Sequence, residues 1–416
     1  MPEPYVVVGT GIAGATAALT LRAEGWRGPL VLIGQEPEPP YRRPPLSKEV
    51  LRGGQAPART ALRPVGSWAE QDIELRTGTT VTRLDPARRR LVLGDGGELR
   101  YARLLLATGG RPRVLPATAG IRGVHQLRTL AEATALRDAL AAGGSLLVVG
   151  AGLIGLEVAA VARQLGCEVT VAETAPEPLG RVLPARLARA VTARHRDRGV
   201  DLRTGVLLDR FEEYEGGVAA YAGGELFHQA DRVVVAVGAA PATALAEEAG
   251  LAVDDGILVD AYGATSAPDV FAAGEVARRP HPLGEGTCRA EHWTPAQEHG
   301  AAVARAMLGK GEGYRAVPWY WTHQYEVNLQ VAGYPGLADR IQLDGSVEEL
   351  DFAALLWRGE RLVGTVCAGR PRAFPPLRAL IGTTRGGDGA EGGTGDRALL
   401  AGFAEPPVPL DRGSLA

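Results

Sequence analysis

The sequence predicts an α/β protein with two Rossmann-like dinucleotide-binding domains, the second inserted in the first, plus a C-terminal α+β domain. Two glycine-rich turns of one design indicate this. Gly9-Thr10-Gly11-Ile12-Ala13-Gly14 follows the apolar run 5–8, and Gly150-Ala151-Gly152-Leu153-Ile154-Gly155 follows the run 146–149. Each precedes an Ala-rich, helix-compatible stretch, so free backbone N–H groups and a helix dipole would face a pyrophosphate. One such string is weak evidence, whereas two in full strand–turn–helix context predict two bound dinucleotides.

Length, composition and charge limit the classes of function. A chain of 416 residues predicts two or three domains, and 45% hydrophobic residues with a mean hydropathy of −0.02 are typical of a globular protein. A net charge of −3 gives no reason to expect nucleic acid or an anionic membrane as partner. Cys167, Cys288 and Cys367 form no CxxC, so neither a disulfide framework nor a redox dithiol is expected. The start resembles no secretory signal and no apolar run is long enough to span a membrane, so we expect a cytoplasmic protein.

The first βαβ unit has strands at 5–8 and 30–33 around a helix near 13–24. Its second strand ends before Gln35 and Glu36, about 20 residues past the glycines, where an acid normally receives the ribose hydroxyls. Either side chain could accept that hydrogen bond. The second unit repeats the plan, and its strand 169–173 ends in Glu173.

Later segments complete the domain pattern. Alternating residues over 88–103 predict a β-meander. An apolar strand that ends in Thr108-Gly109 follows it, and the later strand 233–238 resembles this apolar strand. The inserted domain is therefore expected at 113–239, between 1–112 and 240–317. A third region from 318 to 416 has strand-like stretches at 355–358 and 362–367, and its residues 382–395 are predicted to form a loop.

Several longer motifs resemble the FAD-dependent NAD(P)H:ferredoxin reductases of the putidaredoxin-reductase and aromatic-ring-dioxygenase-reductase type, which have a glutathione-reductase-like fold. They are Tyr41-Arg42-Arg43-Pro44-Pro45-Leu46-Ser47-Lys48, the segment 106–113, Arg128 within 127–130, Trp321-Thr322-His323-Gln324-Tyr325 and Gly369-Arg370-Pro371-Arg372. The resemblance covers nearly the whole chain. It implies an FAD-binding domain at 1–112 with 240–317, an NADH-binding domain at 113–239 and a C-terminal domain at 318–416.

The resemblance also implies the site residues. FAD contacts are expected from Gly9, Gly11, Ala13, Gly14, Gln35 or Glu36, Arg43, Lys48, Val81, Thr108, Gly109, Arg128, Glu275 and Trp293. NADH contacts are expected from Gly150, Gly152, Leu153, Ile154, Gly155, Glu157, Glu173, Arg181 and Gly238. Lys48 and Glu157 are expected to pair near flavin N5, with Glu157 in the first turn of its helix, where it would also complement the dipole. Trp321 is expected to shield the flavin or pass electrons.

Glu173 favours NADH over NADPH because a carboxylate there accepts from both ribose hydroxyls and repels a 2′-phosphate. Glu177 adds a second acid, and Arg181 could bind a 2′-phosphate only in competition with these two carboxylates. Three departures from the family stand out. Ala273-Gly274-Glu275 has Glu in place of the usual Asp, Gln35 stands where an acid is usual, and Gly300-Ala301-Ala302 lacks a basic residue that helps dock an acidic ferredoxin.

The expected function is an FAD-dependent NADH:ferredoxin oxidoreductase that passes single electrons to a [2Fe–2S] ferredoxin serving a cytochrome P450 or a Rieske oxygenase. The chain lacks cysteines for a cluster of its own, and His292, His299 and His323 have no metal spacing. A monomer or weak homodimer is expected. The alternatives are an NADH oxidase or small-molecule reductase on the same scaffold, and a redox-sensing protein that binds both cofactors with slow turnover.

Overall fold

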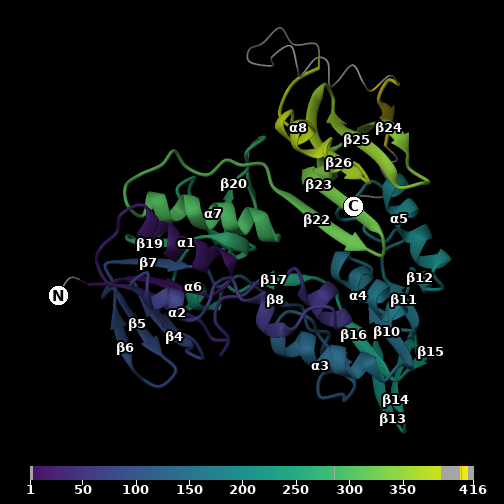
Figure 1. The fold of residues 1–416 in the computed structure, drawn as a ribbon, viewed down its shortest axis with the longest axis horizontal. Coiled ribbons are helices and arrows are strands. Elements are labelled where there is room, and N and C mark those ends of the chain that lie inside the picture. Colours follow the sequence, from purple (N-terminus) through teal and green to yellow (C-terminus); the bar gives the residue numbers. More distant parts are fainter. Residues whose placement is uncertain (1–2, 285, 386–402, 404, 411–416) are drawn as a thin grey trace. The chain divides into compact units, whose positions relative to one another are not determined.

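The computed structural model describes residues 3–284, 286–385, 403 and 405–410, which form two compact units. Unit 1 contains residues 1–44, 58–111 and 239–318, and unit 2 contains residues 45–57, 112–238 and 319–416. Each unit has a parallel sheet with a glycine turn at the end of its central strand (Figure 1). Most of the predicted loop 382–395 lies outside the described residues.

In unit 1 the parallel sheet has the order β19-β7-β1-β2-β3. The strands are β1 (Tyr5–Val8), β2 (Leu30–Ile33), β3 (Ile73–Arg76), β7 (Arg103–Leu106) and β19 (Val270–Ala272). β1 lies between β2 and β7, pairing Val8 with Ile33 on one side and with Leu106 on the other. The chain therefore changes direction across the sheet at β1, and the carboxyl end of such a strand is where open α/β sheets bind ligands.

Alternate residues of β1 face different partners. Tyr5 and Val7 pack in a core with helices α1 (Ile12–Ala23) and α7 (Trp293–Ala306), which lie against each other (Figure 1). Val6 and Val8 pack against the antiparallel strands β4 (Val81–Asp85), β5 (Arg90–Leu93) and β6 (Glu98–Arg100). Because both faces are covered, β1 is a continuous apolar run rather than an alternating one.

Shorter elements complete unit 1. They are α2 (Gly66–Ala69), β8 (Gly110–Pro112, whose last residue belongs to unit 2), β17 (Ala239–Pro241), α6 (Ala244–Glu248), β18 (Ile257–Leu258), the 3₁₀ turn η4 (Gly274–Val276), β20 (Ala277–Pro280) and β21 (Thr287–Cys288).

Unit 2 repeats this design. Its parallel sheet has the order β12-β11-β10-β16-β9, with β9 (Val124–His125), β10 (Ser145–Val149), β11 (Glu168–Glu173), β12 (Asp201–Thr204) and β16 (Arg232–Val235). One face packs against α3 (Leu130–Ala141), α4 (Leu153–Gln164) and α5 (Ala185–Asp197). The other packs against the antiparallel strands β13 (Arg210–Tyr214), β14 (Gly217–Ala222) and β15 (Glu225–Ala230).

The C-terminal part of unit 2 is an antiparallel sheet of order β22-β23-β26-β25-β24-β27 with α8 (Phe374–Ala379) packed on it (Figure 1). Its strands are β22 (Trp319–Gln324), β23 (Val327–Gly333), β24 (Arg340–Ser346), β25 (Asp351–Arg358), β26 (Arg361–Ala368) and β27 (Val408–Pro409). The two parallel sheets with this antiparallel sheet confirm the predicted α/β class with a C-terminal α+β part. Within the described part of the chain, no helix is both long and apolar enough to cross a membrane.

Candidate cofactor sites and the Lys48–Glu157 network

The two glycine turns have the same internal geometry. Gly9 and Gly150 have φ angles of +118° and +104°, and a Cβ at either would lie 2.0 or 2.6 Å from a carbonyl oxygen of the neighbouring strand end. A Cβ at Gly14 or Gly155 would lie 1.9 or 2.1 Å from the carbonyl oxygen of the turn's first glycine. Each outer glycine is therefore required by the packing of the turn itself.

The middle glycines differ, because a Cβ at Gly11 or Gly152 would meet no protein atom within 4 Å. Both are N-caps without a side-chain hydrogen bond, and neither α1 nor α4 has an acidic residue in its first turn. Each middle glycine thus leaves open space before a helix whose first turn has no acidic residue. This is the arrangement that a dinucleotide pyrophosphate fits.

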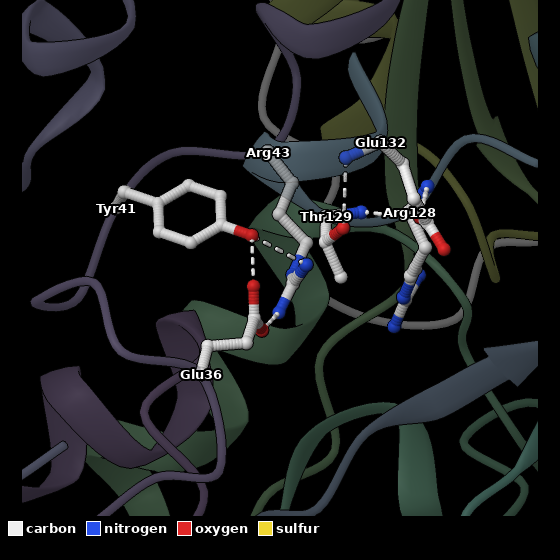
Figure 2. Close-up of polar contacts among 6 residues, drawn as sticks. All are labelled: Glu36, Tyr41, Arg43, Arg128, Thr129 and Glu132. Atoms are coloured by element: carbon white, nitrogen blue, oxygen red, sulfur yellow. Dashed lines mark hydrogen bonds and ion pairs between the residues drawn. The ribbon is translucent and has the colours of Figure 1, made fainter. Parts of the chain in front are cut away.

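At the end of β2, Glu36 joins a polar cluster (Figure 2). Its carboxylate accepts hydrogen bonds from the Tyr41 hydroxyl and from Arg43 Nη2, the latter at 2.5 Å. Gln35 beside it is exposed. Of the two residues left open from the sequence, the structure places Glu36 in the cluster with Arg43. Tyr41 was not selected as a site residue, although it begins the motif that contains Arg43.

Glu275 lies in η4 and is 8% exposed, and its carboxylate lies against Gly110, where a Cβ would be 2.5 Å from Oε1. The extra methylene of this Glu is accommodated because Gly110 has no side chain. The preceding Gly274 donates its N–H to His299 Nδ1 at 3.2 Å. Sequence reasoning did not assign this role to His299.

The other predicted contacts in unit 1 come from several strands and helices. Thr108 donates its hydroxyl to the Ala242 carbonyl at 2.8 Å, next to Gly109 with φ +68°. Ala13 is buried in α1, where a Cβ at Gly274 would lie 2.7 Å from its Cβ. Val81 begins β4 and Trp293 begins α7, and both are half-buried.

In unit 2, Glu173 ends β11 and folds back over the glycine turn. Its Oε2 accepts the Ala151 N–H at 2.7 Å, and its Oε1 accepts the Ala175 N–H at 2.9 Å. Arg181 is exposed and lies beside Gly238, with its Nη1 3.7 Å from an ideal Cβ there. Leu153 and the exposed Ile154 are the first residues of α4.

Arg128 precedes α3, and its backbone N–H donates to Glu132 at 2.8 Å (Figure 2). Thr129 and Glu132 form a capping box that fixes the start of this helix.

The Lys48 ammonium donates to Oε2 of Glu157 at 2.6 Å, although the residues are 109 positions apart. Both are buried, with exposures of 7% and 3%. Ser47 donates its hydroxyl to the same Oε2 at 2.5 Å, and Thr322 donates to Oε1 at 2.6 Å. Because a buried carboxylate needs hydrogen-bond donors, these groups together compensate its charge.

The expected position of Glu157 in the first turn of its helix is wrong. α4 begins at Leu153, so Glu157 is its fifth residue, and its carboxylate pairs with Lys48 instead of complementing the helix end. Sequence reasoning also missed Ser47 and Thr322, although both stand inside the quoted motifs. Side chains alternate between the two faces of a strand, and β22 buries Tyr320, Thr322 and Gln324 on one face. This alternation could have indicated that Thr322 is buried.

Trp321 is on the opposite, half-buried face of β22, and its ring centroid lies 5.7 Å from that of Trp319. Trp319 also packs against Phe374 at 5.6 Å, which makes it part of the core of the C-terminal sheet. Both indoles are half-buried.

The three cysteines are unbonded, and burial raises the pKa of the Cys367 thiol to about 12. Among the described residues, no group of three or more His, Cys, Asp or Glu side chains is arranged to hold a metal ion.

Comparison with protein families decides the class. The pyridine nucleotide-disulphide oxidoreductase model matches residues 3–300, and the reductase C-terminal model matches residues 319–391. The chain belongs to the pyridine nucleotide-disulphide oxidoreductase family.

Individual relatives show which members of this family the chain resembles. The chain is 38% identical to rhodocoxin reductase of Rhodococcus erythropolis, over 91% of this chain and 89% of the relative. It is 37% identical to putidaredoxin reductase of Pseudomonas putida, over 91% and 92% of the two chains. The structure of the covalent putidaredoxin reductase–putidaredoxin complex matches with a TM-score of 0.89 and 36% identity, covering 97% of this chain and 99% of that one. These matches confirm the resemblance inferred from the motifs.

Proposed function

We propose that this protein is an FAD-dependent NADH:ferredoxin reductase. The observation that supports it most directly is the duplicated glycine turn, in which each middle glycine leaves open space before an uncapped, acid-free helix start. Two such sites in one chain fit two dinucleotides, one resident and one exchanging. The relatives are named as a rhodocoxin reductase, a putidaredoxin reductase and the ferredoxin–NAD(+) reductase component of an anthranilate 1,2-dioxygenase system, which supports the same activity here.

In this proposal unit 1 holds FAD. Gly9, Gly11 and Gly14 receive the pyrophosphate, and Glu36 accepts the adenosine ribose hydroxyls while Arg43 neutralises its charge. Glu275 accepts hydroxyls of the ribityl chain. Ala13, Val81, Thr108, Gly109 and Trp293 complete the contacts proposed for unit 1, and Arg128 is a further contact that the family resemblance implies.

Unit 2 holds NADH against Gly150, Gly152 and Gly155, with Leu153, Ile154, Arg181 and Gly238 at its edges. Glu173 accepts the ribose hydroxyls and repels a 2′-phosphate, so NADH is preferred to NADPH. Because Glu173 also accepts the Ala151 N–H, its carboxylate is already fixed beside the turn. The Lys48 ammonium, held by Glu157, stabilises negative charge on the reduced flavin.

When bound, FAD supplies the redox chemistry, accepting hydride from NADH and releasing electrons singly. We infer that they go to a [2Fe–2S] ferredoxin, which serves a cytochrome P450 or a Rieske oxygenase, with Trp321 near the exit. At Gly300, in the segment that lacks the expected basic residue, a Cβ would lie 2.2 Å from the Ala13 carbonyl oxygen. Close packing of α7 on α1 therefore explains the glycine. The proposed setting is the cytoplasm, as a monomer or weak homodimer.

Anaerobic stopped-flow spectroscopy tests the proposal. The purified protein should show an oxidised flavin spectrum that bleaches faster with NADH than with NADPH. Cytochrome c reduction should then accelerate when a [2Fe–2S] ferredoxin is added. A protein that takes up no FAD contradicts the proposal. Rapid NADH oxidation that no ferredoxin accelerates favours the alternative of an NADH oxidase or small-molecule reductase.

A further inference from the structure

Strand β22 carries two kinds of side chain on its two faces. Tyr320, Thr322 and Gln324 are 7%, 2% and 3% exposed, whereas Trp321 is half-buried and His323 is exposed. The buried face meets α4 and α5 of the same unit, where Glu157 and His195 point toward it. One strand thus joins Trp321 to the hydrogen-bond network of Glu157.

The direction of every hydrogen bond in this network follows from the carboxylate. Glu157 only accepts, so Thr322 uses its single proton toward Oε1 at 2.6 Å. The Thr322 oxygen must then accept, and Gln324 Nε2 donates to it at 3.2 Å. This orients the Gln324 amide, whose Oε1 lies 2.8 Å from His195 Nε2 and accepts its proton. Burial lowers the pKa of His195, in agreement with a neutral ring protonated at Nε2.

The two oxygens of Glu157 are held unequally. Lys48 and Ser47 both donate to Oε2, whereas Thr322 is the donor to Oε1 among the described residues. The torsion that turns a carboxylate is broad and roughly two-fold, so a donor at the second oxygen narrows the rotation further than donors at one oxygen do. Thr322 therefore helps to hold the carboxylate plane that receives the Lys48 ammonium.

We propose that Thr322 is a positioning residue for flavin reduction, acting through Glu157 on Lys48, with Gln324 and His195 holding Thr322 in its donor orientation. The proposal rests on the proposed function, because Lys48 matters only if its charge acts on the flavin. It assigns to the C-terminal sheet a role in accepting hydride, in addition to any role of Trp321 in passing electrons on.

Thr322→Val tests this, because Val keeps the shape, removes the donor and leaves Oε1 of Glu157 unsatisfied. Thr322→Ser keeps the hydroxyl and should restore the wild-type behaviour. Thr365→Val is the matched control, since Thr365 is fully buried in the same sheet and its hydroxyl donates to the Ala354 carbonyl at 2.9 Å, away from Glu157. All variants are studied as FAD-loaded protein.

Two measurements separate positioning from stability. At saturating NADH, Thr322→Val should reduce its flavin about 10-fold more slowly, with little change in the half-saturating NADH concentration, as expected for a lost buried hydrogen bond. Dye equilibration should show the flavin midpoint potential about 30 mV lower, a tenfold change for a two-electron couple. Thr365→Val should lower the melting temperature and change neither measurement.

The inference is overturned if Thr322→Val matches wild type in both rate and potential, or if Thr365→Val shifts them equally. If Thr322→Val does not fold, Gln324→Met replaces it. This variant keeps the Thr322 hydroxyl but removes the amide that donates to it. An unchanged rate and potential in Gln324→Met also overturn the inference. Failure of the wild-type protein to be reduced by NADH removes the proposed function itself, a result distinct from an unaffected variant.

Discussion

Lys48 and Glu157 form a buried ion pair at 2.6 Å, joining residues 109 positions apart within one unit. Lys48 is in the short helix η1 (Leu46–Val50) after two prolines, and Glu157 is in α4. Two charges removed from water depend on each other, because removing one takes away the opposite charge that offsets the burial of the other.

Glu157→Gln should therefore destabilise unit 2 by about 3 kcal/mol, since it leaves the Lys48 ammonium without a counter-charge. Adding Lys48→Met to Glu157→Gln should recover part of this loss. The urea midpoint of the purified protein measures both changes. Lys48→Met alone is measured as well. If the stability lost in the double variant equals the sum of the losses in the two single variants, the residues are not coupled and the prediction is wrong.

The middle and outer glycines should respond differently to alanine. Gly11→Ala and Gly152→Ala should fold, because both backbones are extended and a Cβ meets no protein atom. Gly11→Ala should nevertheless lose FAD, and Gly152→Ala should keep FAD and raise the KM for NADH about 10-fold or more, as expected if the backbone no longer approaches the pyrophosphate closely. Flavin content and steady-state kinetics measure these effects.

Gly14→Ala and Gly155→Ala are the matched comparison, because their Cβ atoms would lie 1.9 and 2.1 Å from a carbonyl oxygen. Both should lower the melting temperature before any cofactor is added. Equal behaviour of the middle and outer variants would contradict the assignment of the open space to a ligand.

Gly110→Ala should displace the Glu275 carboxylate, because the new Cβ would lie 2.5 Å from Oε1. FAD release should then be about 10-fold faster, in line with the 1–3 kcal/mol typical of overpacking. Adding Glu275→Asp, which is one methylene shorter, should restore retention. Fluorescence of released FAD measures this, with Glu275→Asp alone as control; a double variant that releases FAD as fast as Gly110→Ala speaks against the contact.

Acid should destabilise unit 1 through His299. Burial, with a smaller contribution from Arg279, lowers the pKa of this ring to about 3. Below the unfolded pKa of about 6.5 the unfolded chain binds a proton that the folded ring does not, so stability falls by about 1.4 kcal/mol per pH unit as pH decreases from there. Burial lowers the pKa of His292 to about 4, so it contributes in the same direction.

Urea titrations between pH 7 and pH 5 measure this slope. His299→Asn should flatten it, because Asn offers an acceptor to the Gly274 N–H without titrating. An unchanged slope in this variant would show that His299 is not the group responsible.

The sequence by itself determined those parts of the fold and of the candidate sites that depend on residues close together in the chain. The two glycine turns, their flanking strands and helices, and the acids at the ends of β2 and β11 follow from residues within a few positions of one another. Their periodicity and spacing are sufficient because a βαβ unit is a local structure. The motif around Lys48 was found by its resemblance to a known family.

Only the tertiary structure decided which distant side chains meet. Ser47 and Thr322 reach Glu157 across 110 and 165 positions, and no local pattern encodes such a contact. It likewise showed Glu36 and not Gln35 in the cluster with Arg43, and Glu275 folded against Gly110. A buried charge is stable only with donors around it, and those donors are supplied by whichever elements the packed core brings beside it.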